Sequence, residues 1–395
     1  MTNPKRFIPG CDLTAGFLFC KIKEDFMFVS ESMYELGSKR SAIRELFEYG
    51  KKRAAIVGAE NVYDFSLGNP TVPAPDCVNE TIRELTQSLD SISLHGYTSA
   101  QGDLETRQAI ADYLNNTYET NFKADNLYMT MGAAASLSIA FKALTSSPDD
   151  EIIAIAPFFP EYRVFVTAAG AKFNVVAPDT KNFQINFDEF EKLVNKNTKA
   201  VIINSPNNPS GAVYSEQTIK KLVDFLSKKS EEYGTHIFII TDEPYREIVY
   251  DGVEVPYVTK YYNDTIVCYS YSKSLSLPGE RIGYLVIPSE ASDSEDLISA
   301  ASVATRILGF VNAPTLQQKV VKACLNAKTD ISYYDRNREA LYNGLKELGF
   351  ECVRPEGAFY LFVKSPVEDE KAFCAAAKKY NILIVPGSSF GCPGY

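Results

Sequence analysis

Short apolar runs alternate with longer amphipathic stretches through the middle of the chain. Runs that are rich in Ile and Val and end at Pro, Asn, Asp or Gly are typical of strands buried on both faces of a sheet. They lie at 151–156, 199–204, 236–241, 265–270 and 282–287. Apolar residues at helical spacing fill stretches such as 215–233 between them. Because strands and helices alternate, we predict an α/β fold whose mostly parallel sheet is covered by helices.

The two ends of the chain show a different pattern. A helical periodicity runs from about 316 to 348, and an apolar run at 359–363, a helix around 371–380 and a second apolar run at 382–385 follow it. Residues 28–60 are also helical in pattern, so we expect a smaller α+β domain built from both chain ends. The predicted units are an unassigned extension at 1–26, an N-terminal part of the small domain at 27–74, a large domain at 75–312 and the small domain at 313–395.

The composition is that of an ordinary globular protein and excludes several classes of function. Hydrophobic residues make up 45% of the 395 residues and charged residues 23%, which excludes a disordered chain. The net charge of −10, without a long basic run, argues against a nucleic-acid partner. Eight scattered cysteines without a C-x-x-C pair indicate reduced thiols in a cytoplasmic protein. Two histidines exclude a multi-histidine metal site, and no apolar run is long enough for a membrane span.

Polar and small residues follow the predicted strands, at the edge where parallel sheets bind ligands. An Asn- and Pro-rich turn fills 204–211, Asp242 follows the third strand and Lys273 the fourth, and small residues follow 128–130. Each has an ordinary structural explanation when taken alone. Asp242 can cap a helix, Lys273 can be solvated, and three consecutive alanines starting at Ala133 can reflect close packing. Their convergence on one edge predicts a ligand site.

These residue types suit the chemistry of pyridoxal phosphate. The amine of Lys273 can form a Schiff base with an aldehyde. Asp242 can pair with a pyridinium nitrogen, and Tyr245 can donate to a phenolate oxygen. A helix start at 132–134 offers free amides and the positive end of the helix dipole to a phosphate, and Arg281 adds a cation.

Five motifs carry a resemblance to a known family. They are Asn208-Pro-Ser-Gly211, Asp242-Glu-Pro-Tyr245, Ser270-Tyr-Ser-Lys273 continuing to Gly283, Tyr97-Thr-Ser-Ala-Gln-Gly102 and Pro386-Gly-Ser-Ser-Phe-Gly391. From about Met27 to Tyr395 the chain resembles the fold-type I, pyridoxal-phosphate-dependent aminotransferases of class I and II, of the aspartate and aromatic type. The resemblance implies pyridoxal 5'-phosphate as cofactor, bound by the domain at 75–312, and transfer of an amino group from an L-amino acid to a 2-oxo acid. It also implies amino-acid biosynthesis by a cytoplasmic homodimer with shared active sites and without a membrane partner.

The resemblance assigns a role to individual residues. Lys273 matches the lysine that forms the cofactor's Schiff base and shuttles the substrate proton, and Asp242 matches the partner of the pyridine nitrogen. Tyr245 and Asn208 match the ligands of the 3-oxygen, and Asn208 is also an expected substrate contact. The other matches are the phosphate ligands Ser270, Arg281 and the amides of Ala133 and Ala134, the stacking ring of Phe159, the intersubunit phosphate contact Tyr97, and Gly68 at the substrate carboxylate.

One departure from the family concerns the substrate. The family pattern continues past Gly391 to an arginine that clamps the substrate carboxylate, whereas this sequence ends at Tyr395. We therefore expect an incomplete small domain and weak binding of amino acids, with the cofactor site intact.

The alternative reactions with the same fold and cofactor are those of a decarboxylase and of a C–S β-lyase. That group tends to place Arg-x-Trp after the glycine at 211, where this chain has Ala-Val-Tyr, and the sequence contains no Trp. A non-enzymatic regulator is disfavoured because no basic domain is attached. The amino donor stays open among aspartate, aromatic amino acids and alanine.

Overall fold

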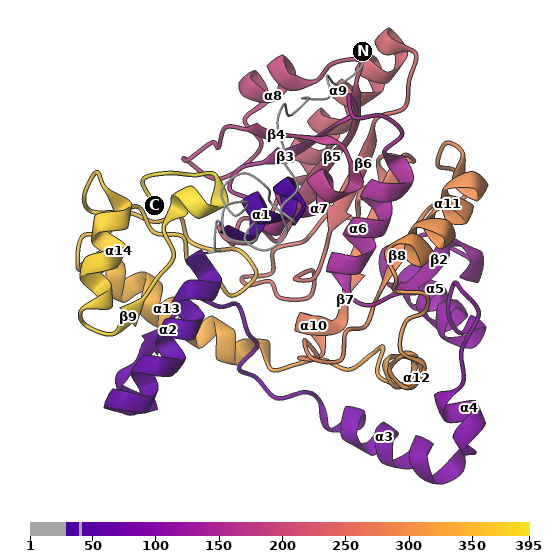
Figure 1. The fold of residues 1–395 in the computed structure, drawn as a ribbon, viewed down its shortest axis with the longest axis horizontal. Helices are drawn as coiled ribbons and strands as arrows, with labels where there is room; N and C mark the ends of the chain where they lie inside the picture. The colour runs from indigo at the N-terminus through magenta and orange to yellow at the C-terminus, as the bar shows by residue number, and fades with distance from the viewer. Residues whose placement is uncertain (1–28, 39–41) are drawn as a thin grey trace, which may run out of the picture.

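The computed structural model describes residues 29–38 and 42–395, and a seven-stranded sheet lies at its centre (Figure 1). Its strands are β2 (Leu127–Thr130), β3 (Glu151–Ile155), β4 (Lys172–Val176), β5 (Thr198–Asn204), β6 (Phe238–Asp242), β7 (Thr265–Ser270) and β8 (Gly283–Val286). Their order is β2-β8-β7-β6-β5-β3-β4. β8 runs antiparallel to both neighbours, while the other adjacent pairs are parallel. The mostly parallel sheet and its five predicted strands are confirmed, and the predicted extension at 1–26 lies outside the described residues.

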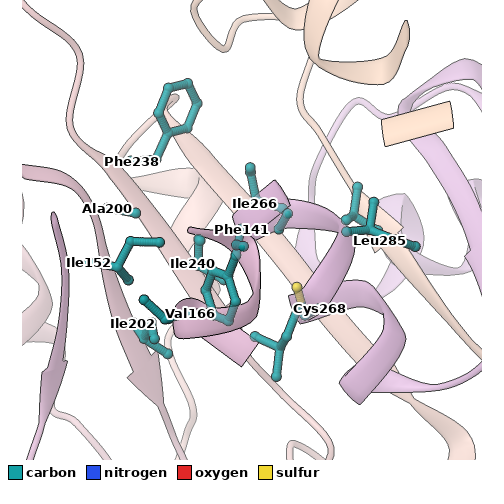
Figure 2. Packing of buried hydrophobic residues seen from close by; sticks show 14 of the residues in the cluster. Phe141, Ile152, Val166, Ala200, Ile202, Phe238, Ile240, Ile266, Cys268 and Leu285 are labelled. Atoms are coloured by element: carbon teal, nitrogen blue, oxygen red, sulfur yellow. The ribbon is translucent and has the colours of Figure 1, made fainter. Parts of the chain in front are cut away.

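The central strands bury both faces, as their uninterrupted apolar sequences predict. Alternate residues of a strand point to opposite sides, so Ile152 and Ala154 join one core cluster, whereas Ile153 and Ile155 join another. Figure 2 shows Ile152 and Phe141 among the side chains of the first of these clusters. The sheet is therefore held between two layers of side chains.

Helices cover both faces of the sheet (Figure 1). The face drawn in Figure 2 is covered by α6 (Ala133–Leu144), α7 (Glu161–Ala169) and α11 (Ser294–Ile307). The other face is covered by α8 (Phe187–Leu193) and α9 (Glu216–Tyr233) over β3, β5 and β6, and by α3 (Asp76–Ser88), α5 (Leu104–Tyr118) and α12 (Thr315–Ala323) near β2, β7 and β8. Two short helices are α4 (Ser91–His95) and α10 (Tyr271–Ser274). The 3-10 turns are η1 (Ala59–Asn61), η2 (Ala124–Asn126), η3 (Val258–Lys260) and η4 (Gly387–Phe390). This layering confirms the α/β class. Within 29–38 and 42–395, no helix combines the length and apolar character that a bilayer crossing requires.

The two chain ends meet in a small second sheet. β1 (Tyr63–Asp64) pairs in parallel with β9 (Ile382–Leu383). α1 (Glu31–Ser38), α2 (Ala42–Val57), α13 (Ile331–Glu347) and α14 (Glu370–Lys378) complete this part of the chain. The predicted association of the two ends is thus seen as a strand pair, while the domain limits at 74 and 312 stay a prediction.

One expectation for the C-terminal part is wrong. The helix predicted over 316–348 is interrupted, because Asp330 caps a new helix by accepting a hydrogen bond from the Ser332 amide. The apolar run at 359–363 forms no strand in this described segment, which has an isolated bridge between Cys352 and Val363. Phe359 and Tyr360 pack with Tyr245, whereas Phe362 packs with Phe183 and Phe390.

Candidate active site

The strand topology gathers the predicted site at one edge of the large sheet. The carboxyl ends of β2, β5, β6 and β7 lie there, each followed by a motif residue. β8 runs the other way, and its first residue, Gly283, pairs with both Thr130 and Ser270. Arg281, which precedes β8 in the sequence, is therefore brought to the same edge as Lys273, which follows β7.

A small anion-binding cradle lies where β2 turns into α6. Gly132 has φ 89°, and a Cβ placed on it would lie 2.9 Å from Arg281 Nη2 and 3.4 Å from Ser270 Oγ. The first amides of α6, those of Ala133 and Ala134, have no acceptor one turn earlier in the helix. The guanidinium of Arg281, the hydroxyl of Ser270 and the N-terminus of α6 thus surround a space that is open because residue 132 is a glycine. These three groups together suit the binding of a phosphate.

Asp242 has one satisfied and one unsatisfied oxygen. Its Oδ2 accepts a hydrogen bond of 2.5 Å from the hydroxyl of Tyr162, which is also buried. Its Oδ1 is buried and has no hydrogen-bond partner among the described residues. Burial raises the pKa of Asp242 to about 7, against the opposite effect of the Tyr162 hydrogen bond. A buried carboxylate oxygen without a donor is costly, so this atom fits the protonated ring nitrogen of pyridoxal phosphate.

Lys273 extends from α10 toward the chain segment before α3. Its Nζ donates a hydrogen bond of 2.6 Å to the carbonyl oxygen of Gly68 and lies 5.4 Å from the ring centre of Phe359. Burial, and then the charge of Arg281, lowers the pKa of Lys273 to about 8. A larger fraction of the amine is therefore unprotonated near neutral pH than for an exposed lysine, as a nucleophile requires.

Two tyrosines meet next to this lysine. The hydroxyl oxygens of Tyr245 and Tyr360 lie 2.5 Å apart. Burial raises the pKa of Tyr245, and the nearby side chain of Asn208 opposes that rise. The Asn208 amide donates to Asn204 Oδ1 at 2.7 Å. A Cβ on Gly68 would overlap the Tyr360 hydroxyl, so glycine is required at this close approach.

The structure brings most of the predicted site residues together and leaves one apart. Lys273 Nζ lies 6.0 Å from the ring centre of Tyr245, and Asn208 and Asp242 both hydrogen-bond Asn204. Gly68 lies beside Lys273, and Ala133, Ala134, Ser270 and Arg281 lie at the anion cradle. Phe159 lies with its ring centre 5.6 Å from that of Tyr162. Tyr97 is 91% exposed, in the loop between α4 and α5, and its side chain faces solvent in the single chain.

Three residues of the site were not predicted as such from the sequence. Asn204 ends β5 and donates from Nδ2 to the main-chain oxygen of Asp242 at 2.7 Å. Tyr162 lies near the start of α7, three residues after Phe159 in the sequence. Because Phe159 was already a candidate stacking ring, this spacing could have identified Tyr162 as a site residue. Tyr360 lies in the apolar run at 359–363, where nothing in the local sequence distinguishes it from a core residue.

Several known proteins are similar to this chain in both sequence and fold. The model of the family "Aminotransferase class I and II" matches residues 60–395. The crystal structure of an amino transferase from Eubacterium rectale is 64% identical in sequence, with a TM-score of 0.91 over 93% of each chain. Aspartate aminotransferase from Thermotoga maritima is 32% identical over 87% of this chain and 88% of its own length, and its solved structure gives a TM-score of 0.80 over 93% of each chain. A probable aspartate/prephenate aminotransferase from Aquifex aeolicus is 30% identical over 85% of each chain. With the family model covering most of its length, this chain belongs to the class I and II aminotransferases.

Proposed function

We propose that this aminotransferase binds pyridoxal 5'-phosphate at the edge where β2, β5, β6 and β7 end, and uses it to move an amino group from an L-amino acid to a 2-oxo acid. The observation that carries the proposal is the buried Oδ1 of Asp242, which has no donor among the described residues. The anion cradle at Gly132 and the amine of Lys273 lie at the same edge.

Each residue around this edge has a definite task in the proposal. The cofactor supplies an aldehyde carbon for the amino group and an electron-withdrawing ring. Asp242 holds a proton on the ring nitrogen, and Tyr162 fixes the orientation of that carboxylate by its hydrogen bond. Tyr245 and Asn208 bind the 3-oxygen. The neutral amine of Lys273 would hold the cofactor's aldehyde carbon, and it would carry the proton to and from the substrate Cα.

The remaining contacts hold the cofactor and the substrate in place. Ser270, Arg281 and the amides of Ala133 and Ala134 bind the phosphate, and the ring of Phe159 stacks on the cofactor. The main chain of Gly68, with Asn208, contacts the substrate carboxylate.

We extend the proposal to a cytoplasmic homodimer. The exposed Tyr97 reaches the phosphate in the neighbouring subunit, and the exposed apolar side chains of Ile92 and Leu104 on either side of its loop support an interface there. The described cysteines are free thiols, which is usual in a reducing compartment.

The relatives indicate which donors to test first. The Thermotoga maritima protein is named for aspartate, and the Aquifex aeolicus protein for aspartate and prephenate, at nearly equal identity to this chain. Aspartate is therefore our first candidate donor, and aromatic amino acids and alanine complete the panel.

Borohydride reduction tests the cofactor site independently of turnover. Chain incubated with pyridoxal phosphate should turn yellow, and reduction should fix the pyridoxyl group on Lys273, as peptide mapping by mass spectrometry would show. A Lys273→Ala chain serves as the control and should carry no label at the site. A label that maps to another lysine would refute the assignment.

The reaction class is tested with the same loaded protein. With a suitable L-amino acid, an aminotransferase releases the matching 2-oxo acid and leaves the cofactor in its amine form. A lyase would release pyruvate, ammonia and a thiol from cystathionine. If pyruvate forms from cystathionine and the amine form of the cofactor does not appear, the chain is a lyase and the proposed transamination is wrong.

A further inference from the structure

Two cysteines that lie far apart in the sequence come together between α3 and α12. Cys77 is the second residue of α3, and Cys324 is the residue that ends α12. Their Sγ atoms lie 3.1 Å apart, and the structure describes both as free thiols. A disulfide bond is about 2.05 Å long, so a shift of about 1 Å would join the two sulfurs.

The surrounding packing fixes this pair in place. Val78 next to Cys77, and Val320 and Val321 next to Cys324, are buried in one shared core cluster. Thr81, one turn along α3 from Cys77, lies near the Cys324 thiol and opposes the rise of its pKa that burial causes. The sulfurs are therefore held against each other by the native contact between two helices, and bond formation requires no rearrangement of the fold.

We propose that Cys77 and Cys324 form a reversible disulfide that responds to small-molecule disulfides such as oxidised glutathione. The Cys77 thiolate attacks one sulfur of glutathione disulfide, which forms a mixed disulfide and releases one glutathione thiolate. The Cys324 thiolate then attacks the Cys77 sulfur and releases the second glutathione. Two protein thiols are oxidised, one glutathione disulfide is reduced to two thiols, and the two thiol protons pass to the solvent and the leaving thiolates.

The order of the two steps follows from exposure. Cys77 is partly exposed, whereas Cys324 is 1% exposed, so a soluble disulfide reaches Cys77 first. Burial, and then the hydrogen bond with Cys77, raises the pKa of the Cys324 thiol to about 12. Burial still disfavours the Cys324 thiolate in the mixed disulfide, so the second step should accelerate at mildly alkaline pH.

The consequence for the molecule is a closed loop of chain. The bond would join positions 77 and 324, and every strand of the large sheet lies between them. α12 also supports the loop that carries Tyr97, because Thr315 donates to the Gly96 carbonyl and Gln318 accepts from the Asp103 amide. Oxidation should therefore stabilise the large sheet against unfolding, by restricting the unfolded chain.

The test is oxidation of the full chain with glutathione disulfide at mildly alkaline pH. We expect two of the eight thiols to be lost and a cross-linked peptide that contains Cys77 and Cys324. The melting temperature should rise by roughly 5 °C and return to its starting value with dithiothreitol. Peptide mapping distinguishes this bond from any bond that involves Cys11 or Cys20.

Three variants make the outcome decisive. Cys77→Ser and Cys324→Ala should each abolish both the cross-linked peptide and the rise in melting temperature. Cys374→Ser, which removes another partly buried thiol, should keep both. If wild-type Cys77 only accumulates a glutathione adduct, or if the rise persists in Cys77→Ser, the proposal is wrong.

Discussion

The carboxyl group of Asp242 is subject to two opposing effects at the scale of a single residue. Burial disfavours its charged form, and the hydrogen bond from Tyr162 favours it, with burial dominating in the cofactor-free chain. A protonated ring nitrogen next to Oδ1 would add the donor that this oxygen lacks. The residue is therefore poorly satisfied by the protein alone, and two measurements follow from this.

The first measurement is stability against pH in the cofactor-free chain. The pKa of Asp242 rises from 3.8 to about 7 on folding, so the folded chain binds this proton more tightly than the unfolded chain. The stability associated with this proton is complete below pH 3.8 and is lost as pH rises through about 7. Asp242→Asn should flatten the decline in urea unfolding free energy over this range. Parallel curves for the two chains would contradict the assignment.

The second measurement separates cofactor binding from turnover in Asp242→Asn. The amide cannot keep the proton on the ring nitrogen, so kcat should fall about 100- to 1,000-fold, as for a broken buried ion pair. The cradle formed with Arg281 and Ser270 should keep the Kd for pyridoxal phosphate within about tenfold of wild type. Equal losses in kcat and affinity would show that Asp242 acts mainly by holding the cofactor.

Lys273 gives a prediction that needs no cofactor. The pKa of this lysine is lowered to about 8, first by burial and then by the charge of Arg281. The rate at which acetic anhydride modifies Lys273 in the cofactor-free chain should rise with pH to a midpoint near 8. Arg281→Gln should move that midpoint upward. Mass spectrometry of the Lys273 peptide measures both, with the exposed Lys192 as the reference.

The connections between elements decide where the functional residues lie. β-branched runs predicted the strands, and strand ends predicted Asp242 and Lys273, because burial on both faces leaves a clear sequence pattern. The place of Arg281 depends on the antiparallel direction of β8, which a run of apolar residues does not encode. Tyr360 was missed for a related reason, since an aromatic residue in a packed loop has the same local sequence as one in a strand.

The attachment of α6 to the sheet is tested by Phe141. This side chain is completely buried between α6 and the strands, as Figure 2 shows. Phe141→Ala should lower the free energy of unfolding by about 3–5 kcal/mol, through lost burial and a residual cavity. Leu348→Ala, at a side chain that is 77% exposed, should change it by about 0.5 kcal/mol or less. Urea denaturation measures both, and equal effects would refute the packing described here.

At the scale of the whole molecule, Tyr97 connects the active site to assembly. In the proposed homodimer its hydroxyl binds the neighbouring subunit's phosphate, so Tyr97→Phe should raise the Kd for pyridoxal phosphate about tenfold. The melting temperature of the cofactor-free protein should not change, because without the cofactor the Tyr97 hydroxyl has no phosphate to bind. Tyr63→Phe, at another exposed tyrosine, is the control. A monomer in sedimentation analysis with unchanged affinity in Tyr97→Phe would refute the shared site.

The parallel pairing of β1 with β9 also bears on how the chain is made. Tyr63 pairs with Ile382, and 319 residues (382 − 63) separate them. At translation rates of about 5–20 residues per second, β1 leaves the ribosome roughly 15–60 s before its partner. Meanwhile the apolar side chains of Tyr63, Phe65 and Leu67, about half exposed even in the folded chain, have no strand to join. The β1–β9 pair is thus expected to form only when synthesis is nearly complete, whereas the strands of the large sheet, all within residues 127–286, can pair earlier.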